Sequence, residues 1–208
     1  MPVPMKDNFT SEVLRDAVEA IGSLPGVGRR SALRLALHLL SQPPENIERF
    51  SRAVGRLATD VHFCRVCNMV SDSELCPVCA DSRRDPSTIC VVENAGDAMS
   101  IEATGQFNGV YHVLGGIISP INGLGPSDID IEGLVRRVAE LPEAEVIFAM
   151  SGDVEGETTA FYIYRRIARE GVKVSTLARG LGFGDNLEYA DSLTLGRSLA
   201  NRQIFKPL

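Results

Sequence analysis

Two short stretches decide the fold of this chain: Cys64-Arg-Val-Cys67 and Cys76-Pro-Val-Cys79, with eight residues between them. A Cys-x-x-Cys pair on a tight turn directs both sulfurs at one point, and two such pairs supply the four thiolates of a structural Zn²⁺ site. We therefore predict a zinc ion here, in preference to two disulfides or buried free thiols. Four sulfurs leave no open coordination position, which argues against catalysis at the metal. His62 is expected to be a bystander.

The length and composition are those of a globular protein with one or two domains and a small additional module. No run approaches the roughly 20 apolar residues of a membrane span, and the N-terminus has no apolar signal core. Cysteine usage then indicates a cytoplasmic protein. The fifth cysteine, Cys90, lies in an apolar run, where we expect a buried strand residue and not a nucleophile.

The charge is distributed unevenly along the chain. The net charge of −6 by itself argues against nucleic-acid binding. However, residues 1–84 carry 11 Lys and Arg against 10 Asp and Glu, whereas residues 85–208 carry 10 against 17. We therefore place any phosphate-binding surface in the first part and expect the second part to face metal ions, basic partners or water.

A glycine-rich turn joins two predicted helices near the N-terminus. Apolar residues recur at helical spacing up to Gly22, after a Thr-Ser cap, and a second apolar run covers residues 32–40. Between them lies Leu24-Pro-Gly-Val-Gly28-Arg-Arg-Ser31. This order of helix, tight glycine turn and helix resembles the helix-hairpin-helix motif.

The residues of this hairpin suit a phosphate ligand. Gly26 and Gly28 let the backbone turn and approach a ligand closely, and the N–H groups of the next helix face it. Arg29 and Arg30 flank the hairpin, and Arg34 lies one helical turn beyond Arg30. Such contacts predict sequence-independent, salt-sensitive DNA binding. The alternative is a helical hairpin that uses glycine for geometry and arginine for solubility.

A third helix is predicted after Pro43-Pro44, and it leads into the cysteine pairs. Its arginines are interpreted as a solvated face. Its apolar stripe, which serves either its own core or a partner subunit, consists of Ile47, Phe50, Val54, Leu57 and Val61.

After a linker at residues 82–86, strands and helices alternate. Strands are predicted at residues 88–92, 111–114, 145–150 and 172–175, and helices from residue 97, from residue 127 and over about 158–170. This alternation predicts an α/β unit with a largely parallel sheet. Because ligands of such sheets bind at the carboxyl ends of the strands, Glu93, Ser151, Asp153 and Glu155 fall on the expected functional edge.

The acidic edge resembles the Toprim fold of topoisomerases, primases and some nucleases. In Toprim enzymes a glutamate acts in acid–base chemistry and an Asp-x-Asp pair holds Mg²⁺. Here the corresponding run is Ala149-Met-Ser-Gly-Asp-Val-Glu-Gly-Glu157, in which Ser151 replaces the first Asp of the pair. Losing a carboxylate weakens a Mg²⁺ site, so we predict a non-catalytic edge that receives a basic partner. The alternative is a Toprim-type metal-dependent nuclease or topoisomerase-like enzyme.

Taken together, the motifs resemble the bacterial recombination mediator family RecR over essentially the whole chain. The order implied is a helix-hairpin-helix region at residues 1–60, a four-Cys zinc finger at 61–84, a Toprim domain at 85–180 and a C-terminal oligomerisation segment at 181–208. Further matches include Tyr111-His-Val-Leu114 and Thr194-Leu-Gly-Arg-Ser-Leu199. The stretch Leu181-Gly-Phe-Gly184 departs from the family and lacks the Lys of a P-loop, so no role is assigned to it.

The resemblance implies a DNA-repair factor without chemistry of its own. RecR-like proteins form ring-like tetramers that clamp DNA, and they act with RecO and RecF to load RecA on single-stranded DNA. For this chain, the resemblance implies a location at the nucleoid and the packing of residues 194–202 within the oligomer. It also implies DNA contacts from the glycine hairpin and a partner-binding Toprim face that comprises Glu93, Asp97, Asp153, Glu155 and Glu157.

Overall fold

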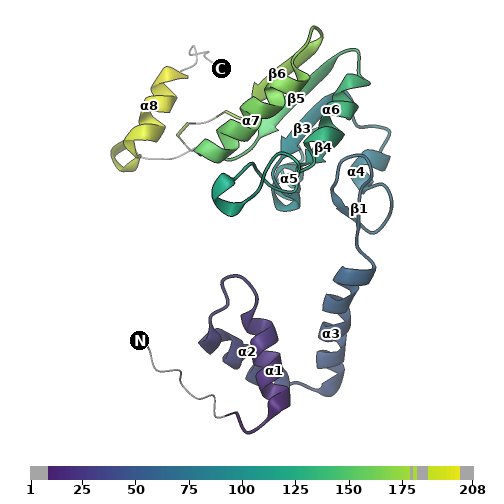
Figure 1. Ribbon diagram of the computed structural model, residues 1–208, viewed down its shortest axis with the longest axis vertical. Coiled ribbons are helices and arrows are strands. Elements are labelled where there is room, and N and C mark those ends of the chain that lie inside the picture. The colour runs from purple at the N-terminus through teal and green to yellow at the C-terminus, as the bar shows by residue number, and fades with distance from the viewer. Residues whose placement is uncertain (1–8, 179, 182–186, 202–208) are drawn as a thin grey trace. The chain divides into compact units, whose positions relative to one another are not determined.

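The computed structural model describes residues 9–178, 180, 181 and 187–201 (Figure 1). By internal contacts the chain divides between Asp60 and Val61 into two compact units. Within the described ranges, no helix has the length and apolar character that crossing a membrane requires.

The first unit is helical. Helix α1 (Glu12–Gly22) begins at the N-cap Ser11, whose hydroxyl accepts a hydrogen bond from the Leu14 N–H at 3.3 Å. Helix α2 (Arg29–Leu40) packs against α1. The contact buries Val18 of α1 against Ala32 and Ala36 of α2, because small side chains on α2 let the two helices approach closely. The predicted pair of helices around a glycine turn is confirmed.

Helix α3 (Pro44–Thr59) begins with proline at its first position, as the Pro43-Pro44 step predicts. None of its residues is buried. Phe50, Val54 and Leu57 of its apolar stripe are 52%, 50% and 67% exposed. The stripe that the sequence predicts therefore exists on α3 but is not covered by its own chain in the part that the structure describes.

The second unit opens with the cysteine pairs. Strand β1 (His62–Phe63) pairs antiparallel with β2 (Val70–Ser71), and the short helix α4 (Pro77–Ala80) carries the last cysteine. The hairpin therefore encloses the first Cys-x-x-Cys pair.

A four-stranded parallel sheet forms the core of this unit, in the order β4-β3-β5-β6. Its strands are β3 (Thr88–Val92), β4 (Val110–Val113), β5 (Ala144–Ala149) and β6 (Val172–Thr176). Helix α5 (Ala95–Glu102) follows β3, α6 (Ile131–Ala139) follows β4 and α7 (Val154–Ile167) follows β5 (Figure 1). The predicted parallel α/β sheet is confirmed.

Strands β3 and β4 are buried on both faces of the sheet, whereas β6 is partly exposed. One face, with Ile89 and Val91 of β3, packs against Leu134 of α6 and Ile163 of α7. The other face, with Cys90, packs against α5 and the cysteine module, and its buried residues are Cys90, Val92, Ala98, Tyr111, Val113 and Ala149. This double burial explains why β3 reads as a continuous apolar run in the sequence. Cys90 is 2% exposed, as expected for a strand residue.

Three helices begin at different places from those predicted. Helix α5 begins at Ala95, two residues before the predicted start at Asp97, because Asn94 caps it by accepting the Asp97 N–H at 3.1 Å. Helix α7 begins at Val154, about four residues earlier than expected, because Asp153 caps its first turn by accepting the Gly156 N–H at 2.8 Å. Helix α6 begins at Ile131, because Asp130 caps it by accepting the Gly133 N–H at 3.0 Å. In the C-terminal part, a 3₁₀ turn (Leu187–Tyr189) precedes helix α8 (Ser192–Ala200). Most of the stretch 181–184, and Arg202 of the predicted oligomerisation tail, lie outside the described residues.

Candidate functional sites

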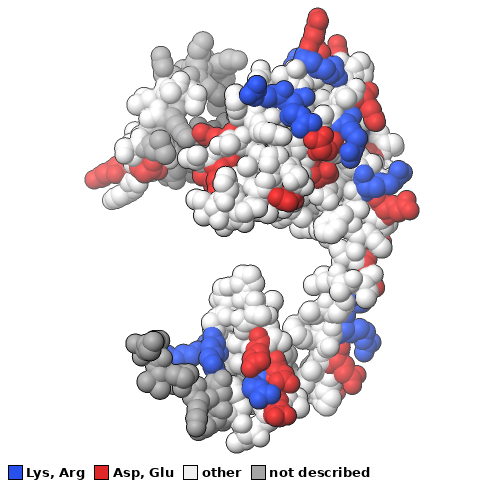
Figure 2. Space-filling model, viewed as in Figure 1, with Lys and Arg blue, Asp and Glu red and all other residues white. Residues whose placement is uncertain are grey.

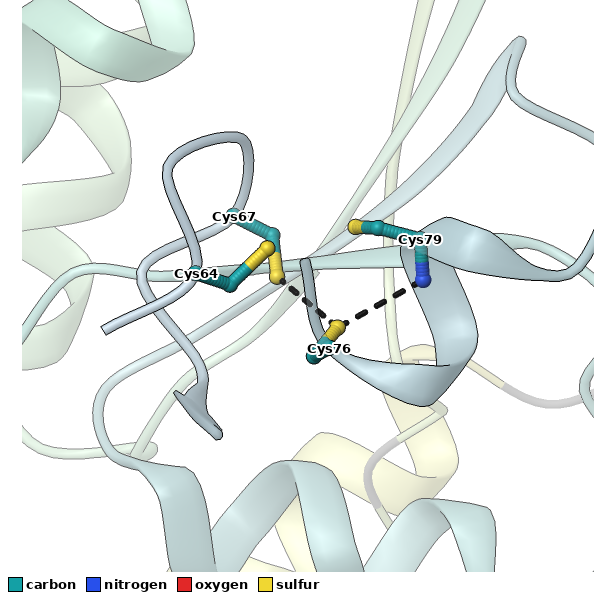
Figure 3. Close-up of side chains that lie close together, drawn as sticks. All are labelled: Cys64, Cys67, Cys76 and Cys79. Atoms are coloured by element: carbon teal, nitrogen blue, oxygen red, sulfur yellow. Dashed lines mark hydrogen bonds between the residues drawn. The ribbon is translucent and has the colours of Figure 1, made fainter. Parts of the chain in front are cut away.

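Four cysteine side chains face one another at the start of the second unit (Figure 3). Cys64 and Cys67 come from the loop closed by β1 and β2, and Cys76 and Cys79 from the N-cap and third residue of α4. Their sulfur atoms all lie within 4.8 Å of one another, and the Cys67 and Cys76 sulfurs are 3.5 Å apart. Sulfurs bound tetrahedrally at about 2.3 Å from Zn²⁺ would be separated by about 3.8 Å. The geometry therefore fits one structural zinc ion, as predicted, and His62 is not part of the group.

The electrostatics of the cluster favour a bound cation. The Cys67 thiol donates a hydrogen bond to the Cys79 sulfur, which lowers the pKa of Cys79 to about 6. The same hydrogen bond, together with burial, raises the pKa of Cys67, and burial raises the pKa of Cys76. Without a metal, Cys79 is thus the thiolate among these three cysteines, and Cys67 and Cys76 keep their protons. A divalent cation replaces these protons and lets all four sulfurs carry charge.

The zinc module is docked on the edge strand of the sheet. The Val113 N–H of β4 donates to the Cys67 carbonyl at 2.8 Å, and the Asn68 side-chain amide donates to the Val113 carbonyl at 2.9 Å. Asn68 adopts a left-handed conformation with φ 59°, which asparagine tolerates better than most residues. These two bonds satisfy the outer backbone groups of β4 at Val113, so the module is oriented by the sheet and covers its edge.

An ion pair anchors the linker segment that follows the zinc module in the sequence. Arg84 donates to the Glu102 carboxylate at the end of α5, and to the Phe107 carbonyl at 3.1 Å. Glu102 also accepts the Tyr111 hydroxyl at 2.9 Å. The Arg84 side chain is only 17% exposed, so the segment interpreted from sequence as a linker is anchored to the sheet.

The glycine hairpin of the first unit has the features of a phosphate-binding turn. Gly26 has φ +78°, a left-handed conformation that favours glycine, and nothing lies within 4 Å of the position that a Cβ would occupy there. Gly28 is the N-cap of α2 and offers no side-chain cap to its first turn. Arg29, Arg30 and Arg34 are exposed, and Arg30 and Arg34 lie one turn apart on α2. The predicted DNA-contact residues are therefore together on one exposed hairpin.

The carboxyl ends of β3 and β5 meet, as the parallel sheet requires. Glu93 follows β3, and its carboxylate accepts a hydrogen bond from the Ser151 N–H after β5. The Ser151 hydroxyl donates to Asp153 at 3.0 Å, and Asp153 also caps α7. A Cβ on Gly156 would lie 2.4 Å from the Ser151 carbonyl oxygen, so the motif needs glycine there for close approach.

The remaining acidic residues of the predicted partner face are held in local structure or exposed on α7. Asp97 completes a capping box with Asn94 at the start of α5. Glu155 accepts the Ser119 hydroxyl at 2.7 Å, and Glu157 is exposed in the first turn of α7. Carboxylates in the first turn are stabilised by the helix dipole.

The arrangement of these carboxylates differs from a metal-binding cluster. In the part of the chain that the structure describes, only the four cysteines bring three or more potential ligand atoms close enough to share one ion. The acidic edge can accept hydrogen bonds and attract basic groups. Because fewer than three carboxylates converge there among the described residues, a Mg²⁺ ion at this edge would need water or phosphate oxygens as its remaining ligands.

Sequence reasoning missed Ser119, Asn68 and Arg84. Ser119 precedes Pro120 and caps a 3₁₀ turn, a Ser-Pro signal that the sequence contains. Asn68 follows the first cysteine pair, where a left-handed residue commonly ends a tight turn. Nothing local in the sequence identifies the carboxylate that pairs with Arg84, because Glu102 lies 18 residues away.

Comparison with known families accounts for nearly the whole chain. The RecR helix-hairpin-helix family matches residues 14–57, the RecR four-cysteine zinc finger domain 61–81, the Toprim domain 87–178 and the RecR C-terminal family 180–203. The chain is 52% identical over 201 residues to a protein named recombination protein RecR from Bacteroides thetaiotaomicron, covering 97% of this chain and 98% of the relative. Proteins of the same name from Porphyromonas gingivalis and Flavobacterium johnsoniae are 51% and 50% identical, over 97% and 95% of this chain and 97% and 96% of their own lengths.

The order of modules defines the class: a helix-hairpin-helix, a four-cysteine zinc finger and a Toprim domain in one α and α/β chain. Similarity over nearly the full length of each relative then narrows that class to one family. The chain belongs to the RecR family of recombination proteins. The resemblance drawn from the sequence and the structural zinc are both confirmed.

Proposed function

We propose that this protein is a non-enzymatic recombination mediator: an oligomeric DNA clamp that works with RecO and RecF to load RecA on gapped or single-stranded DNA. It acts in the cytoplasm, at the nucleoid. The observation that carries the proposal is the exposed glycine hairpin with Arg30 and Arg34 on the first helical turns of α2, in a chain of the RecR family. Glycine lets the backbone approach phosphate, and two cations one turn apart neutralise it.

DNA contact through the hairpin is independent of base sequence. Backbone N–H groups and arginine side chains at a helix N-terminus reach phosphate oxygens, which are the same at every step of the duplex. Each phosphate contact releases counterions, so binding weakens steeply as salt rises. Because a single hairpin offers few contacts, useful affinity comes from several hairpins acting together in an oligomer.

Unburied apolar surface in the first unit supports an oligomer. The stripe of α3 is half exposed or more at Phe50, Val54 and Leu57, and Leu37 and Leu40 of α2 are 47% and 68% exposed. Apolar side chains that recur along one helix face are typical of a surface covered by another helix. In the proposed clamp, a second copy of this chain covers these apolar side chains.

A charge-reversal experiment tests the DNA contact. Arg30→Glu with Arg34→Glu should abolish binding of fluorescently labelled DNA, measured by anisotropy across a salt series. Each single Arg→Ala variant should lower the slope of log affinity against log salt by about one unit for every phosphate that the assembly no longer neutralises. The matched control is Arg49→Glu with Arg52→Glu on α3, which makes the same charge change away from the hairpin. Unchanged binding in the Arg30 and Arg34 variant would contradict the assignment.

The alternative function, a Toprim-type nuclease or topoisomerase-like enzyme, predicts a different result. DNA cleaved or relaxed only with Mg²⁺, with the activity abolished in Asp153→Ala, would overturn the non-enzymatic proposal. The hydrogen bonds that engage Asp153 and Glu155 in local structure favour the mediator.

A further inference from the structure

Two exposed apolar side chains stand at the edge of the second unit. Ile121 lies in the 3₁₀ turn η1 (Pro120–Asn122) and is 93% exposed. Val154, the first residue of α7, is 80% exposed. Single exposed apolar residues are common, so these two matter only if the fold holds them together in a fixed arrangement.

The loop that carries Ile121 is fixed internally. Ser119 and Leu124 exchange two backbone hydrogen bonds of 2.9 Å, and the Asn122 side-chain amide donates to the Ser119 hydroxyl at 2.8 Å. Gly123 closes the turn with φ +72°, a conformation that favours glycine. A turn held in this way presents its tip with little conformational freedom left to lose when a partner binds.

The same loop is docked on the start of α7. The Ser119 hydroxyl donates to the Glu155 carboxylate at 2.7 Å, and the Ile118 N–H donates to the Thr159 hydroxyl at 2.9 Å. Ser119 and Thr159 are 1% and 0% exposed, so one partner of each bond is buried and the other is partly buried. Ile121 lies two residues after Ser119 and Val154 directly precedes Glu155. Both exposed side chains therefore flank one partly buried hydrogen bond.

The charges around this point are negative. Asp153 and Glu157 are exposed at the start of α7, and Asp128, which accepts the Gly125 N–H at 2.7 Å, ends the loop. In Figure 2 the surface over the teal loop that precedes α6 in Figure 1 is white, and the coloured atoms nearest to it are red. An uncharged centre with a charged rim is the anatomy of a protein interface, and the negative rim repels nucleic acid.

We propose that Ile121 and Val154 are the apolar anchors of the partner-binding face and that its occupant is a basic protein with an apolar pocket. This inference rests on the proposed function, in which that occupant is the RecO-type partner. Buried apolar anchors carry the larger share of binding energy at such interfaces, whereas rim charges mainly raise the association rate. Glu155 is a positioning residue: its carboxylate accepts a hydrogen bond from the Ser119 hydroxyl and so fixes the orientation of the loop that carries Ile121.

The test uses the full-length protein and the RecO protein of the same organism, with affinity measured by calorimetry or biolayer interferometry. Ile121→Asp and Val154→Asp should each weaken binding at least about tenfold. The matched control is Met99→Asp: Met99 is 52% exposed on α5, which packs on the opposite face of the sheet from α7. This variant should bind as the unaltered protein does. All three variants should retain DNA binding, because the hairpin lies in the other unit.

The role of Glu155 is separated from direct charge recognition by two substitutions. Glu155→Gln keeps an oxygen that accepts from Ser119 and removes the charge, so binding should persist; Glu155→Ala removes the acceptor, so binding should fall. If both variants lose binding equally, the carboxylate charge itself contacts the partner and the positioning role is wrong. If the unaltered protein does not bind RecO, the proposed partnership fails. If it binds and the Ile121 and Val154 variants match Met99→Asp, the anchors alone are wrong.

Discussion

At the scale of single residues, the four cysteines that bind zinc are the main stabilising groups of their module. They converge from two turns that have little apolar core of their own, since the buried apolar residues of this module are the cysteines Cys64, Cys67 and Cys76 themselves. The metal is then the principal source of its folding free energy. The fifth cysteine, Cys90, has a different character, because burial raises its pKa to about 11 and keeps it a neutral thiol.

Replacing one zinc ligand should therefore remove the metal. Cys76→Ser should lower the zinc content from one ion per chain to nearly none, measured by atomic absorption. Free energy of metal binding in small zinc modules is on the order of 10 kcal/mol, so the melting temperature should also fall clearly. Cys90→Ala is the control: it also removes a buried thiol but should keep its zinc. A Cys76→Ser protein that retains one zinc per chain would contradict the assigned ligand set.

His112 of β4 predicts a pH dependence of stability. Its ring is fully buried, Nε2 donates to the Asp130 carbonyl at 2.7 Å, and Nδ1 has no hydrogen-bond partner among the described residues. Burial lowers the pKa of His112, and Arg137 acts in the same direction, while the Asp130 carbonyl and carboxylate act against both. The neutral ring is thus the form that the fold accepts.

The direction of this pH dependence is set by the number of protons that the folded and the unfolded chain bind. Below about pH 6.5 the unfolded chain binds a proton at this histidine before the folded chain does, so the free energy of unfolding falls as pH falls, by up to about 1.4 kcal/mol per pH unit. Urea denaturation at pH 7.5 and 5.5 measures the loss. His112→Gln keeps a donor for Asp130 and cannot titrate, so it should lose less stability between these pH values. His38→Gln on the exposed face of α2 should behave as the unaltered protein does.

At the scale of elements, the sequence predicts most of the framework because hydrophobic periodicity is a local property. Strand β3 has the predicted bounds, β4 and β5 each begin and end one residue earlier than predicted, and β6 ends one residue later. The starts of α6 and α7 were less accurate, since Asp130 and Asp153 end the preceding loops as side-chain caps. The four cysteine ligands were also predictable, because spacing alone encodes them.

Contacts between distant elements were not predictable from the sequence. The Ser119–Glu155 bond joins residues 36 positions apart, and Asn68 reaches Val113 across 45. Neither partner carries a local signal of the other. The consequence is that the carboxylates of the predicted partner face were identified as residues, while their hydrogen bonds, and the exposure of Ile121 beside them, emerge only from the fold.

The ion pair between Arg84 and Glu102, which anchors the linker, is expected to contribute to the free energy of unfolding. Arg84→Ala removes charged hydrogen bonds to Glu102 and to the Phe107 carbonyl in a largely buried setting, so it should lower the free energy of unfolding by about 2 kcal/mol, measured by urea denaturation. Arg83→Ala is the matched control, because the Arg83 side chain is 87% exposed and its pair with Asp81 is solvated. It should leave stability unchanged. Equal effects of the two substitutions would contradict an anchoring role for Arg84.

At the scale of the whole molecule, the two units carry different kinds of surface. The first combines the basic hairpin with uncovered apolar helix faces, and the second combines an acidic face with a packed sheet. A net negative chain can bind DNA only if its few cations are gathered on one surface and used several times over. Oligomer formation and DNA binding are therefore expected to depend on each other.

One substitution on α3 tests that dependence. Val54 lies in the middle of the uncovered stripe and is 50% exposed, so Val54→Asp places a charge where the proposed subunit contact would bury it. The variant should shift to a smaller species, measured by light scattering after size-exclusion chromatography. Its DNA affinity should fall by at least about tenfold although the hairpin is intact, because fewer hairpins then engage one DNA molecule.

Ile121→Asp supplies the matched control, since it also converts an exposed aliphatic residue to aspartate but lies on the second unit. It should leave both the mass in solution and the DNA affinity unchanged. A Val54→Asp protein of unaltered mass would show that α3 is not the subunit contact. A smaller species that binds DNA as tightly as the unaltered oligomer would show instead that one hairpin suffices, and multivalency would no longer explain how so acidic a chain holds DNA.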